Sequence, residues 1–533
     1  MADQVMELGP NAGLVDEMYR RYQENPDSIA PVWREFFADY TPRATVPVPP
    51  PPPAPPAPQT TVAAAPAPPP QASGGGDHAR QINTLDGEEP TPLRGPAKAV
   101  VTNMEASLEV PTATSVRTVP AKLLEINRQI LNNHLARTIA GKVSFTHIIG
   151  YAVLRALQKT PGMNASYGLV DGQPAVARHQ HVNLGLAIDQ QKADGTRSLL
   201  VPNIKSADTL DFAQFHAAYE ELLRKVRSKS ITPDDFAGTT VSITNPGTIG
   251  TMHSVPRLMP GQGVIVGVGS IDYPPEYQGA DPDTIARIGV SKVVTLTSTY
   301  DHRVIQGAES GEFLGAIHHM LLGEDHFYDD IFHSFGVPYE PARWVRDAQP
   351  FDDVTSLAEK AICVHQLINM YRVRGHLIAH LDPLDAEPPH IHPELDPLTY
   401  GLTIWDLPRQ FVADGLAGRD VATLDEILHV LRDAYCRTLA IEYMHIQDPE
   451  QKRWIQQHVE GQPTTLNVEE QRHILGRLNA AEVFERFLHT RYVGQKRFGL
   501  EGAESTIVLL DALLDAAAGS GVAEVVMGMA HRG

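Results

Sequence analysis

A run of proline divides this chain before any other feature is considered. Between Pro42 and Pro70 lie 14 of the 43 prolines in the sequence, mixed with alanine and valine and followed by a Ser-Gly-Gly-Gly run. Proline lacks a backbone N–H donor and fixes φ, so such a tract cannot build a packed core. Low apolarity continues to about Thr112, and we therefore predict an extended, disordered linker over residues 42–115. A ligand for an SH3-type domain is the alternative interpretation of this tract.

The segment before this linker, residues 1–41, has a different pattern. Apolar side chains recur at helical spacing in two stretches, from Val15 to Tyr22 and from Ile29 to Phe37. Two short helices cannot bury such stripes by themselves. We predict a helical arm that docks on the rest of the chain or on a partner.

Composition excludes several classes of partner. The 44 basic and 64 acidic residues give a formal charge of −20, and no run of Lys or Arg occurs, which argues against nucleic acid and anionic membranes. Cys363 and Cys436 are the 2 cysteines, so a disulfide framework or a cysteine-based zinc site is excluded in practice. Neither an apolar stretch of about 18 residues nor a basic-then-apolar leader occurs. We predict a soluble, cytoplasmic chain.

Residues 116–336 alternate between helical and strand patterns, which is typical of an α/β domain. Apolar residues from 212 to 226 follow helical spacing, and four runs rich in β-branched residues predict strands. These runs cover Val182 to Ile188, Thr240 to Thr244, Val264 to Val268 and Val293 to Tyr300.

Residues 337–533 are expected to be mainly helical. Apolar positions share one face in two stretches, 357–371 and 424–435, and a predicted capping box precedes the second. A strand-like run over 523–529 follows, and the sequence stops shortly after it. We therefore predict an α/β multidomain chain whose last domain is started and not finished.

Two strand ends carry residues that suit chemistry. His302 follows one predicted strand and precedes an amphipathic helix, so a rigid support would present it as a general base. The alternative is a hydrogen-bonded structural histidine, one of 23 in the chain. Another strand delivers Thr244 and Asn245 into a Gly/Pro turn, where a developing oxyanion could be stabilised. Asn-Pro-Gly is also ordinary turn chemistry, so spacing alone leaves both interpretations open.

Together, the motifs DHRVIQG and SITNPGTIG resemble the catalytic domain of the 2-oxo acid dehydrogenase acyltransferases, the dihydrolipoyl succinyltransferase and acetyltransferase family. The blocks FTHIIGYAVLRALQKTPGMNASY and VNLGLAIDQQKADGTRSLLVPNI resemble the same family in the same order. The resemblance covers about Val116 to Gly323 and implies a chloramphenicol-acetyltransferase-like α/β domain over residues 116–336.

This resemblance also implies roles for individual residues. His302 would remove the thiol proton of coenzyme A or dihydrolipoamide, and Thr244 would hydrogen-bond the oxyanion, with Asn245 in support. The family usually has aspartate where Gln306 stands, and glutamine supplies no charge to stabilise an imidazolium. Such acyltransferases usually carry lipoyl domains as well, and nothing before Val116 resembles one. We therefore expect a lipoylated acyltransferase component supplied in trans.

The C-terminal third carries a second resemblance. HQLINMYRVRGHLIAHLDPLD, IEYMHIQDPEQKRWIQ, KRFGLEGAEST and VVMGMAHRG resemble the thiamine-dependent 2-oxoglutarate dehydrogenase component, and NPDSIAPVWREFF resembles its opening arm. An acyltransferase domain between that arm and its body is the arrangement of the fused bacterial multifunctional 2-oxoglutarate metabolism enzymes. His531 would then hydrogen-bond substrate or intermediate, and Arg532 would contact a carboxylate or the cofactor. The implied cofactors are thiamine diphosphate and Mg²⁺, whose diphosphate motif is expected beyond Gly533.

The resemblance implies an enzyme that decarboxylates 2-oxoglutarate and passes the succinyl group through dihydrolipoamide to coenzyme A, in the tricarboxylic acid cycle. It adds dihydrolipoamide dehydrogenase, further copies of the chain and a regulatory protein of the phosphopeptide-binding type as partners. Two alternatives stay open at this point. One is an acyltransferase-like scaffold that only organises a complex, and the other is a small-molecule acetyltransferase.

Overall fold

The computed structural model describes residues 22–23, 25–26, 34, 92–93, 96–136, 141–191, 197–228, 230–347, 354–382, 384, 391–462, 466–495 and 499–528. The chain divides into two compact units, Met1–Pro90 and Thr91–Gly533. Nearly all of the predicted arm and most of the predicted linker lie outside the described residues.

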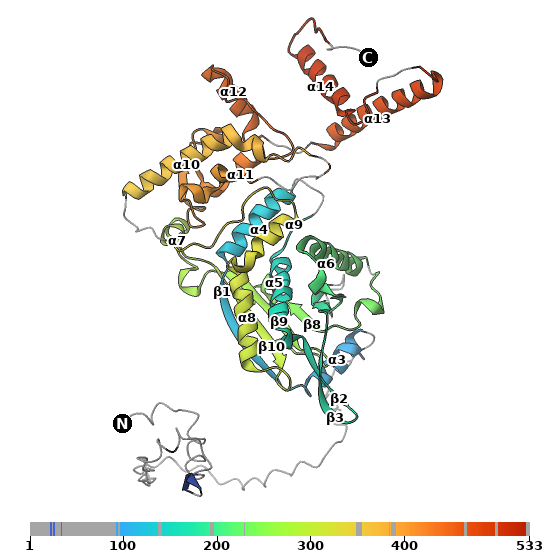
Figure 1. Ribbon diagram of the computed structural model, residues 1–533, viewed down its shortest axis with the longest axis vertical. Helices are drawn as coiled ribbons and strands as arrows, with labels where there is room; N and C mark the ends of the chain where they lie inside the picture. The colour runs from blue at the N-terminus through green and yellow to red at the C-terminus, as the bar shows by residue number, and fades with distance from the viewer. Residues whose placement is uncertain are drawn as a thin grey trace, which may run out of the picture. The chain divides into compact units, whose positions relative to one another are not determined.

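A mixed six-stranded sheet forms the centre of the α/β domain, in the order β1-β10-β9-β8-β4-β7 (Figure 1). Its strands are β1 (Thr112–Pro120), β4 (Leu184–Leu186), β7 (Asn203–Ile204), β8 (Val241–Thr244), β9 (Val264–Asp272) and β10 (Val293–Asp301). Strand β10 is antiparallel to both β1 and β9, whereas β8 is parallel to β9 and β4. The four predicted strand runs are confirmed, although the first is split between β4 and the start of β5 (Ile188–Gln191).

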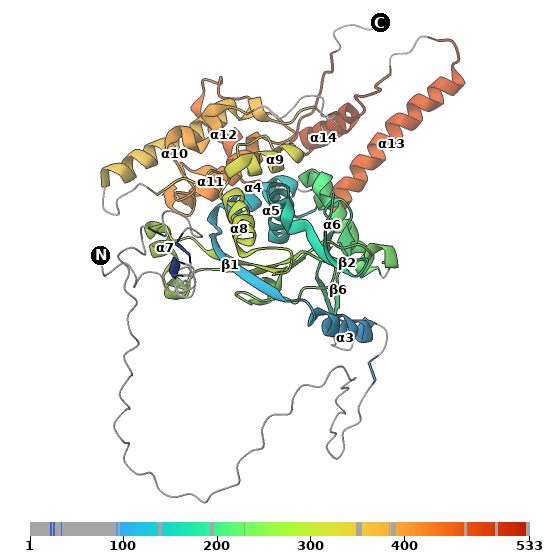
Figure 2. The same ribbon diagram turned by 60° about the horizontal axis from the view of Figure 1, so that its bottom comes forward.

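Helices cover one face of this sheet, as the two views in Figures 1 and 2 agree for α4, α5 and α8. The helices of the domain are α4 (Lys122–Leu135), α5 (Phe145–Lys159), α6 (Phe212–Arg227), α7 (Pro282–Ile288), α8 (Gly307–Leu321) and α9 (Phe327–Ser334). Fully buried side chains such as Ile149 of α5 and Phe313 of α8 join Val266 and Leu296 of the sheet in one hydrophobic core. Two small antiparallel pairs complete the domain, β2 (Ala165–Val170) with β3 (Gln173–Arg178) and β5 with β6 (Arg197–Leu200).

Regular secondary structure begins before residue 115, where the linker was predicted to end. Helix α3 (Pro96–Ser107) and the start of β1 both fall inside the range 42–115. Strand β1 pairs with β10 along its whole length, from Thr112 opposite Asp301 to Pro120 opposite Val293. Hydrogen bonds of the strand ladder hold this segment in place. Because it lacks a marked apolar pattern, the sequence did not indicate that it is ordered.

The region after residue 353 is mainly helical, as predicted. It contains α10 (Val354–Arg374), α11 (Leu424–Tyr435), α12 (Pro449–Val459), α13 (Val468–Arg491), α14 (Ser505–Gly519) and the hairpin of β11 (Gln410–Val412) with β12 (Val421–Thr423). The predicted capping box at α11 is present, since Thr423 and Glu426 exchange backbone-to-side-chain hydrogen bonds. No helix in the described part of the chain is long and apolar enough to cross a membrane.

The predicted strand over 523–529 is wrong for residues 523–528, which form no strand. A strand needs a hydrogen-bonding neighbour, and within the described ranges no strand pairs with this run. Val525 and Val526 are exposed. An incipient thiamine diphosphate-binding domain is therefore not shown.

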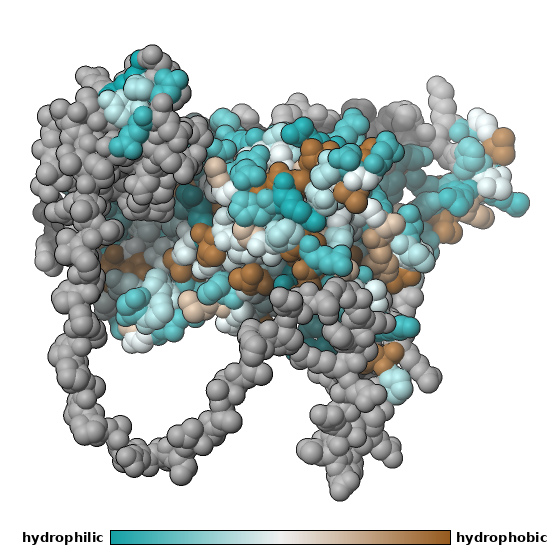
Figure 3. All heavy atoms as spheres, turned by 90° about the horizontal axis from the view of Figure 1, so that it is seen from below, coloured by the Kyte–Doolittle hydropathy of each residue, from teal (hydrophilic) through white to brown (hydrophobic). Residues whose placement is uncertain are grey.

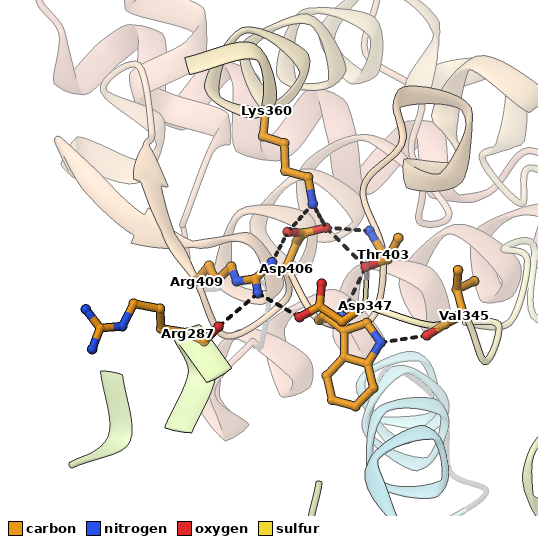
Figure 4. Close-up of polar contacts among 8 residues, drawn as sticks. Arg287, Val345, Asp347, Lys360, Thr403, Asp406 and Arg409 are labelled. Atoms are coloured by element: carbon orange, nitrogen blue, oxygen red, sulfur yellow. Dashed lines mark hydrogen bonds and ion pairs between the residues drawn. The ribbon is translucent and has the colours of Figure 1, made fainter. Parts of the chain in front are cut away.

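A buried polar network ties the helical region to the α/β domain (Figure 4). Lys360 of α10 donates to both carboxylate oxygens of the fully buried Asp406, at 2.6 and 2.7 Å. Arg409 donates to Asp406 at 2.7 Å and to Asp347 at 3.0 Å, and its guanidinium also reaches the Arg287 carbonyl of α7. Burial alone would raise the pKa of Asp406, but its hydrogen bonds, first from Lys360, lower it. The carboxylate is therefore an ionised anchor between the two regions.

Candidate active site

His302 lies in a tight turn between β10 and α8. Its backbone N–H donates to the Pro111 carbonyl at 3.0 Å, and its Nδ1 lies 3.1 Å from the Ile305 carbonyl oxygen. Because a carbonyl oxygen only accepts, Nδ1 carries the hydrogen and Nε2 keeps a free lone pair. The residue is exposed. The turn therefore leaves Nε2 available to a substrate as the nitrogen that can act as a base.

The residues on either side of His302 brace this turn. Arg303 donates to both carboxylate oxygens of Asp301, from Nε at 2.9 Å and from Nη2 at 2.6 Å. Asp301 is buried, and the guanidinium lies 3.9 Å from the ring centroid of Tyr167 on β2. A bidentate pair stacked on an aromatic ring permits few other geometries. The backbone that carries His302 is therefore fixed from both the sheet and the β2–β3 pair.

Gln306 is exposed at the start of α8 and does not orient the histidine. Its backbone N–H donates to Glu309 Oε2 at 2.8 Å. Within the described residues no hydrogen bond links its side chain to His302, whose Nδ1 is bound by the Ile305 carbonyl instead. The ring orientation therefore comes from the backbone.

Thr244 and Asn245 lie at the end of β8, in the turn before Pro246. Asn245 Nδ2 donates to Thr146 Oγ1 at 2.7 Å, which ties this turn to the first residues of α5. Two residues later, Gly247 lies so close to Gly269 that a Cβ would meet its backbone at 2.3 Å. Only glycine fits there, so the turn is pressed against β9.

The strand register separates Thr244 from His302 within one chain. Thr244 pairs with Gly267, which pairs with Thr297 on β10, whereas His302 follows Asp301, four residues further along that strand. His302 is thus five residues along and two strands across from Thr244, and at about 3.3 Å per residue and about 4.8 Å between strands the two positions are roughly 19 Å apart. Contact with one reacting carbon requires about 3 Å. One copy of the chain therefore does not bring these two predicted residues together.

A buried histidine pair adjoins the Thr244 turn. His147, His216 and Glu220 form the one group in the described residues with three metal-ligand atoms close together. His147 Nδ1 accepts the Ser144 backbone N–H at 3.1 Å, so the hydrogen sits on Nε2, 3.5 Å from Glu220 Oε1. A metal would need that nitrogen deprotonated. Burial, and then His216, lowers the pKa of His147 to about 3, and we assign it a structural role.

Sequence reasoning missed four residues that support these turns. The opposite charges of Asp301 and Arg303 around the histidine were a readable signal for the brace. Tyr167 and Thr146 come from distant segments, and no local pattern marks them. His531 and Arg532, predicted to contact substrate and cofactor, lie outside the described residues.

Comparison with known proteins gives the family context. Residues 86–326 match the family model for the 2-oxoacid dehydrogenases acyltransferase (catalytic domain), and residues 8–44 match the 2-oxoglutarate dehydrogenase N-terminus. The multifunctional 2-oxoglutarate metabolism enzyme of Mycolicibacterium vanbaalenii is 50% identical over 559 residues, which cover 99% of this chain and 44% of that protein. The enzyme of the same name from Mycobacterium sp. (strain JLS) is 48% identical over 579 residues, covering 99% and 45%.

Among solved structures, the dihydrolipoamide acetyltransferase of Azotobacter vinelandii is 27% identical, covering 45% of this chain and 96% of that chain with a TM-score of 0.39. The chain spans less than half the length of the curated relatives described above. It is a homologue of the multifunctional 2-oxoglutarate metabolism enzymes and carries their 2-oxoacid dehydrogenase acyltransferase catalytic domain together with a 2-oxoglutarate dehydrogenase N-terminus.

Proposed function

We propose that this chain is part of an enzyme that decarboxylates 2-oxoglutarate and transfers the succinyl group through dihydrolipoamide to coenzyme A. The observation that carries the transfer step is the exposed His302, whose Nδ1 hydrogen is bound by the Ile305 carbonyl at 3.1 Å. This leaves Nε2 as a base at the end of a rigid strand.

In the proposed reaction, Nε2 of His302 takes the proton of the coenzyme A thiol. The thiolate attacks the carbonyl carbon of the succinyl-dihydrolipoamide thioester and forms a tetrahedral oxyanion. A hydroxyl such as that of Thr244 stabilises this oxyanion by donating a hydrogen bond. When the carbon–sulfur bond to dihydrolipoamide breaks, the departing thiolate recovers the proton from Nε2, so the histidine ends as it began.

The Ile305 carbonyl also supports the charged state of the histidine. It keeps accepting the Nδ1 hydrogen when the ring becomes an imidazolium, so that hydrogen bond is not lost during the reaction. A carboxylate at position 306 is therefore not required to hold the ring. This supports chemistry at the site in spite of Gln306 and argues against a purely scaffolding role.

The separation of Thr244 from His302 supports a site shared between two copies of the chain. The segment after Thr244 exposes Ile249, Met252 and Val255, and the β2–β3 pair exposes Leu169. Figure 3 shows apolar residues interrupting the hydrophilic surface on the side of the molecule seen from below. A contact between copies would cover such residues and bring the hydroxyl of one copy to the histidine of the next.

The remaining components of the reaction are proposals drawn from the family. Thiamine diphosphate with Mg²⁺ would supply the decarboxylation, and His531 and Arg532 are the residues proposed to contact substrate or cofactor. Both lie outside the described residues, and no step is derived through them. A lipoylated acyltransferase component in trans, dihydrolipoamide dehydrogenase and a regulatory phosphopeptide-binding protein are the proposed partners, in the cytoplasm.

Steady-state transfer of the succinyl group between succinyl-coenzyme A and dihydrolipoamide tests the proposal. The 533-residue chain should catalyse the exchange in both directions, and acetyl-coenzyme A serves as the comparison donor. A folded chain without turnover of either donor would favour the scaffold hypothesis instead.

A further inference from the structure

The segment 251–258 packs on the sheet face opposite the one that helices α4, α5 and α8 cover. On β9, Gly267 and Gly269 alternate with buried valines of the core, so they belong to this other face. A Cβ on Gly269 would meet the Met252 carbonyl oxygen at 1.8 Å. One on Gly267 would meet the Ser254 hydroxyl at 3.3 Å. The segment therefore lies directly on β9.

Ser254 marks the level of Thr244 along the sheet. Its carbonyl oxygen accepts a hydrogen bond from Thr297 Oγ1 at 2.8 Å. Thr297 of β10 and Thr244 of β8 both pair with Gly267 on the strand between them. Ser254 therefore lies level with the residue proposed to stabilise the oxyanion.

From Ser254 the chain continues towards the turn of His302. It leads to Gly263, whose carbonyl oxygen accepts the Asp301 backbone N–H at 3.2 Å, directly before His302. Arg257 is three residues past Ser254, which is at most about 10 Å of chain. His302 lies about 16 Å beyond the level of Ser254. Arg257 therefore lies between the levels of the two turns that carry the proposed chemistry.

The Arg257 side chain points away from the sheet. Leu258 is fully buried and Pro256 is half-buried, whereas Val255 and Arg257 are exposed. This alternation places Arg257 on the same side of the segment as Val255, one of the apolar residues that a second copy of the chain would cover. The guanidinium therefore projects towards the contact in which the shared site would form.

The Arg257 guanidinium is also unpaired. In the part of the chain that the structure describes, no carboxylate lies within 4.0 Å of it and none of its N–H groups donates a hydrogen bond. The arginine beside His302 differs, because both carboxylate oxygens of Asp301 hold Arg303. The donors of Arg257 are therefore available to a substrate, whereas the charge of Arg303 is already compensated.

The proposed acyl group carries the charge that such a guanidinium binds. A succinyl thioester ends in a carboxylate, a few bonds from the carbonyl carbon that the thiolate attacks, whereas an acetyl group ends in a methyl group. Guanidinium and carboxylate can form two parallel charge-assisted hydrogen bonds. We infer, on the basis of the proposed succinyl transfer, that Arg257 binds the free carboxylate of the succinyl group and selects it over uncharged acyl groups.

Selectivity between two acyl donors of equal chain length tests this inference. Succinyl-coenzyme A carries the terminal carboxylate, and butanoyl-coenzyme A carries a methyl group in its place. In transfer to dihydrolipoamide, Arg257→Met should raise KM for the succinyl donor about 10- to 100-fold. The kcat should change less, because the carboxylate is held equally in the ground state and the transition state. Both constants for the butanoyl donor should stay within about threefold of the parent values, and an equal loss with both donors would show a merely structural role.

Two further variants connect the effect to the guanidinium. Arg227→Met removes an exposed arginine of α6 and should leave the constants for both donors unchanged, so it serves as the matched control. Arg257→Lys keeps the charge but loses the planar fork, so it should restore part of the preference for the succinyl donor. A succinyl preference that Arg227→Met reduces as much as Arg257→Met would contradict the assignment.

Calorimetry with the same two thioesters separates this inference from the proposed reaction. The parent chain should bind succinyl-coenzyme A at least about tenfold more tightly than butanoyl-coenzyme A, and Arg257→Met should bind the two about equally. If this result is obtained with a chain that transfers no acyl group, the proposed reaction is wrong and the carboxylate site stands. Equal binding of the two thioesters by the parent chain, or an unchanged succinyl preference in Arg257→Met, would overturn the inference.

Discussion

The two turns that carry the proposed chemistry follow β8 and β10, which run in opposite directions in the same sheet, and the turns are held in different ways. The His302 turn is braced by an ion pair between the buried Asp301 and Arg303, with Arg303 stacked on Tyr167. The Thr244 turn rests on one side-chain hydrogen bond from Asn245 and on close backbone packing. It leads into a segment with exposed apolar side chains.

This difference indicates what each half of the site needs. The base is oriented completely within one chain, because the backbone fixes both the ring and its tautomer. The hydroxyl is positioned by its own chain but lies roughly 19 Å from that base. We therefore expect changes at His302 to act within each copy and changes at Thr244 to act across a contact between copies.

The largest effect is expected from removing the base. His302→Ala should lower kcat for succinyl transfer by about 10²- to 10⁴-fold, with a smaller change in KM, because proton transfer acts on the transition state. His319→Ala, at an exposed histidine on α8, is the matched control and should keep the parent kcat. A folded His302→Ala variant with near-parent kcat would remove His302 from the mechanism.

A smaller loss is expected at the hydroxyl. Thr244→Ala should lower kcat by about 10²- to 10³-fold, which is typical of losing one oxyanion donor. Thr244→Ser keeps the hydroxyl and should retain most of the activity in the same assay. Equal activities of the alanine and serine variants would show that the hydroxyl has no role.

The support of the Thr244 turn should respond to pH through His147. The pKa of His147 is lowered from 6.5 to about 3 in the folded chain. As the pH falls, the imidazole is therefore protonated in the unfolded chain before it is protonated in the folded chain. The free energy of unfolding is therefore unaffected by titration of this histidine above pH 6.5. It decreases as the pH falls from 6.5 towards 3, by up to about 1.4 kcal/mol per pH unit.

His147→Asn keeps an acceptor near the Ser144 N–H and cannot bind this proton. Its unfolding free energy should therefore change less between pH 7 and pH 4.5 than that of the parent chain, in urea titrations at both values. Parallel profiles for the two chains would contradict the assignment of a buried, neutral His147.

The smallest effect is expected at Gln306. Gln306→Asp and Gln306→Asn should each change kcat by less than about threefold, because this exposed side chain makes no contact that orients the ring. The same steady-state assay measures both. A tenfold change in either direction would show that residue 306 acts on the imidazolium after all.

Local patterns in the sequence predicted the elements that local chemistry controls. The β-branched runs gave β8, β9 and β10, and the motif positions placed His302 and Thr244 at strand ends. Apolar content did not predict segments whose structure depends on strand pairing. Strand β1 is an example, because its hydrogen bonds to β10 keep it ordered. It also failed over residues 523–528, where a β-like composition finds no pairing partner among the described residues.

The relation between the two turns could not be predicted from the motifs. It depends on β8 running parallel to β9 while β10 runs antiparallel to it, and on the register that sets Thr244 level with Thr297. Strand order and direction are long-range properties that no single segment encodes. For the same reason the stacking of Arg303 on Tyr167 and the bond from Asn245 to Thr146 became visible only in the structure.

Complementation between two inactive variants tests the shared site most directly. His302→Ala and Thr244→Ala chains carrying different affinity tags would be coexpressed, purified through both tags and assayed for succinyl transfer. If each site combines the histidine of one copy with the hydroxyl of another, random pairing followed by this selection restores at least about a quarter of the parent activity. Mixed assemblies no more active than the two variants assayed separately would contradict the proposal that His302 and Thr244 act together across copies.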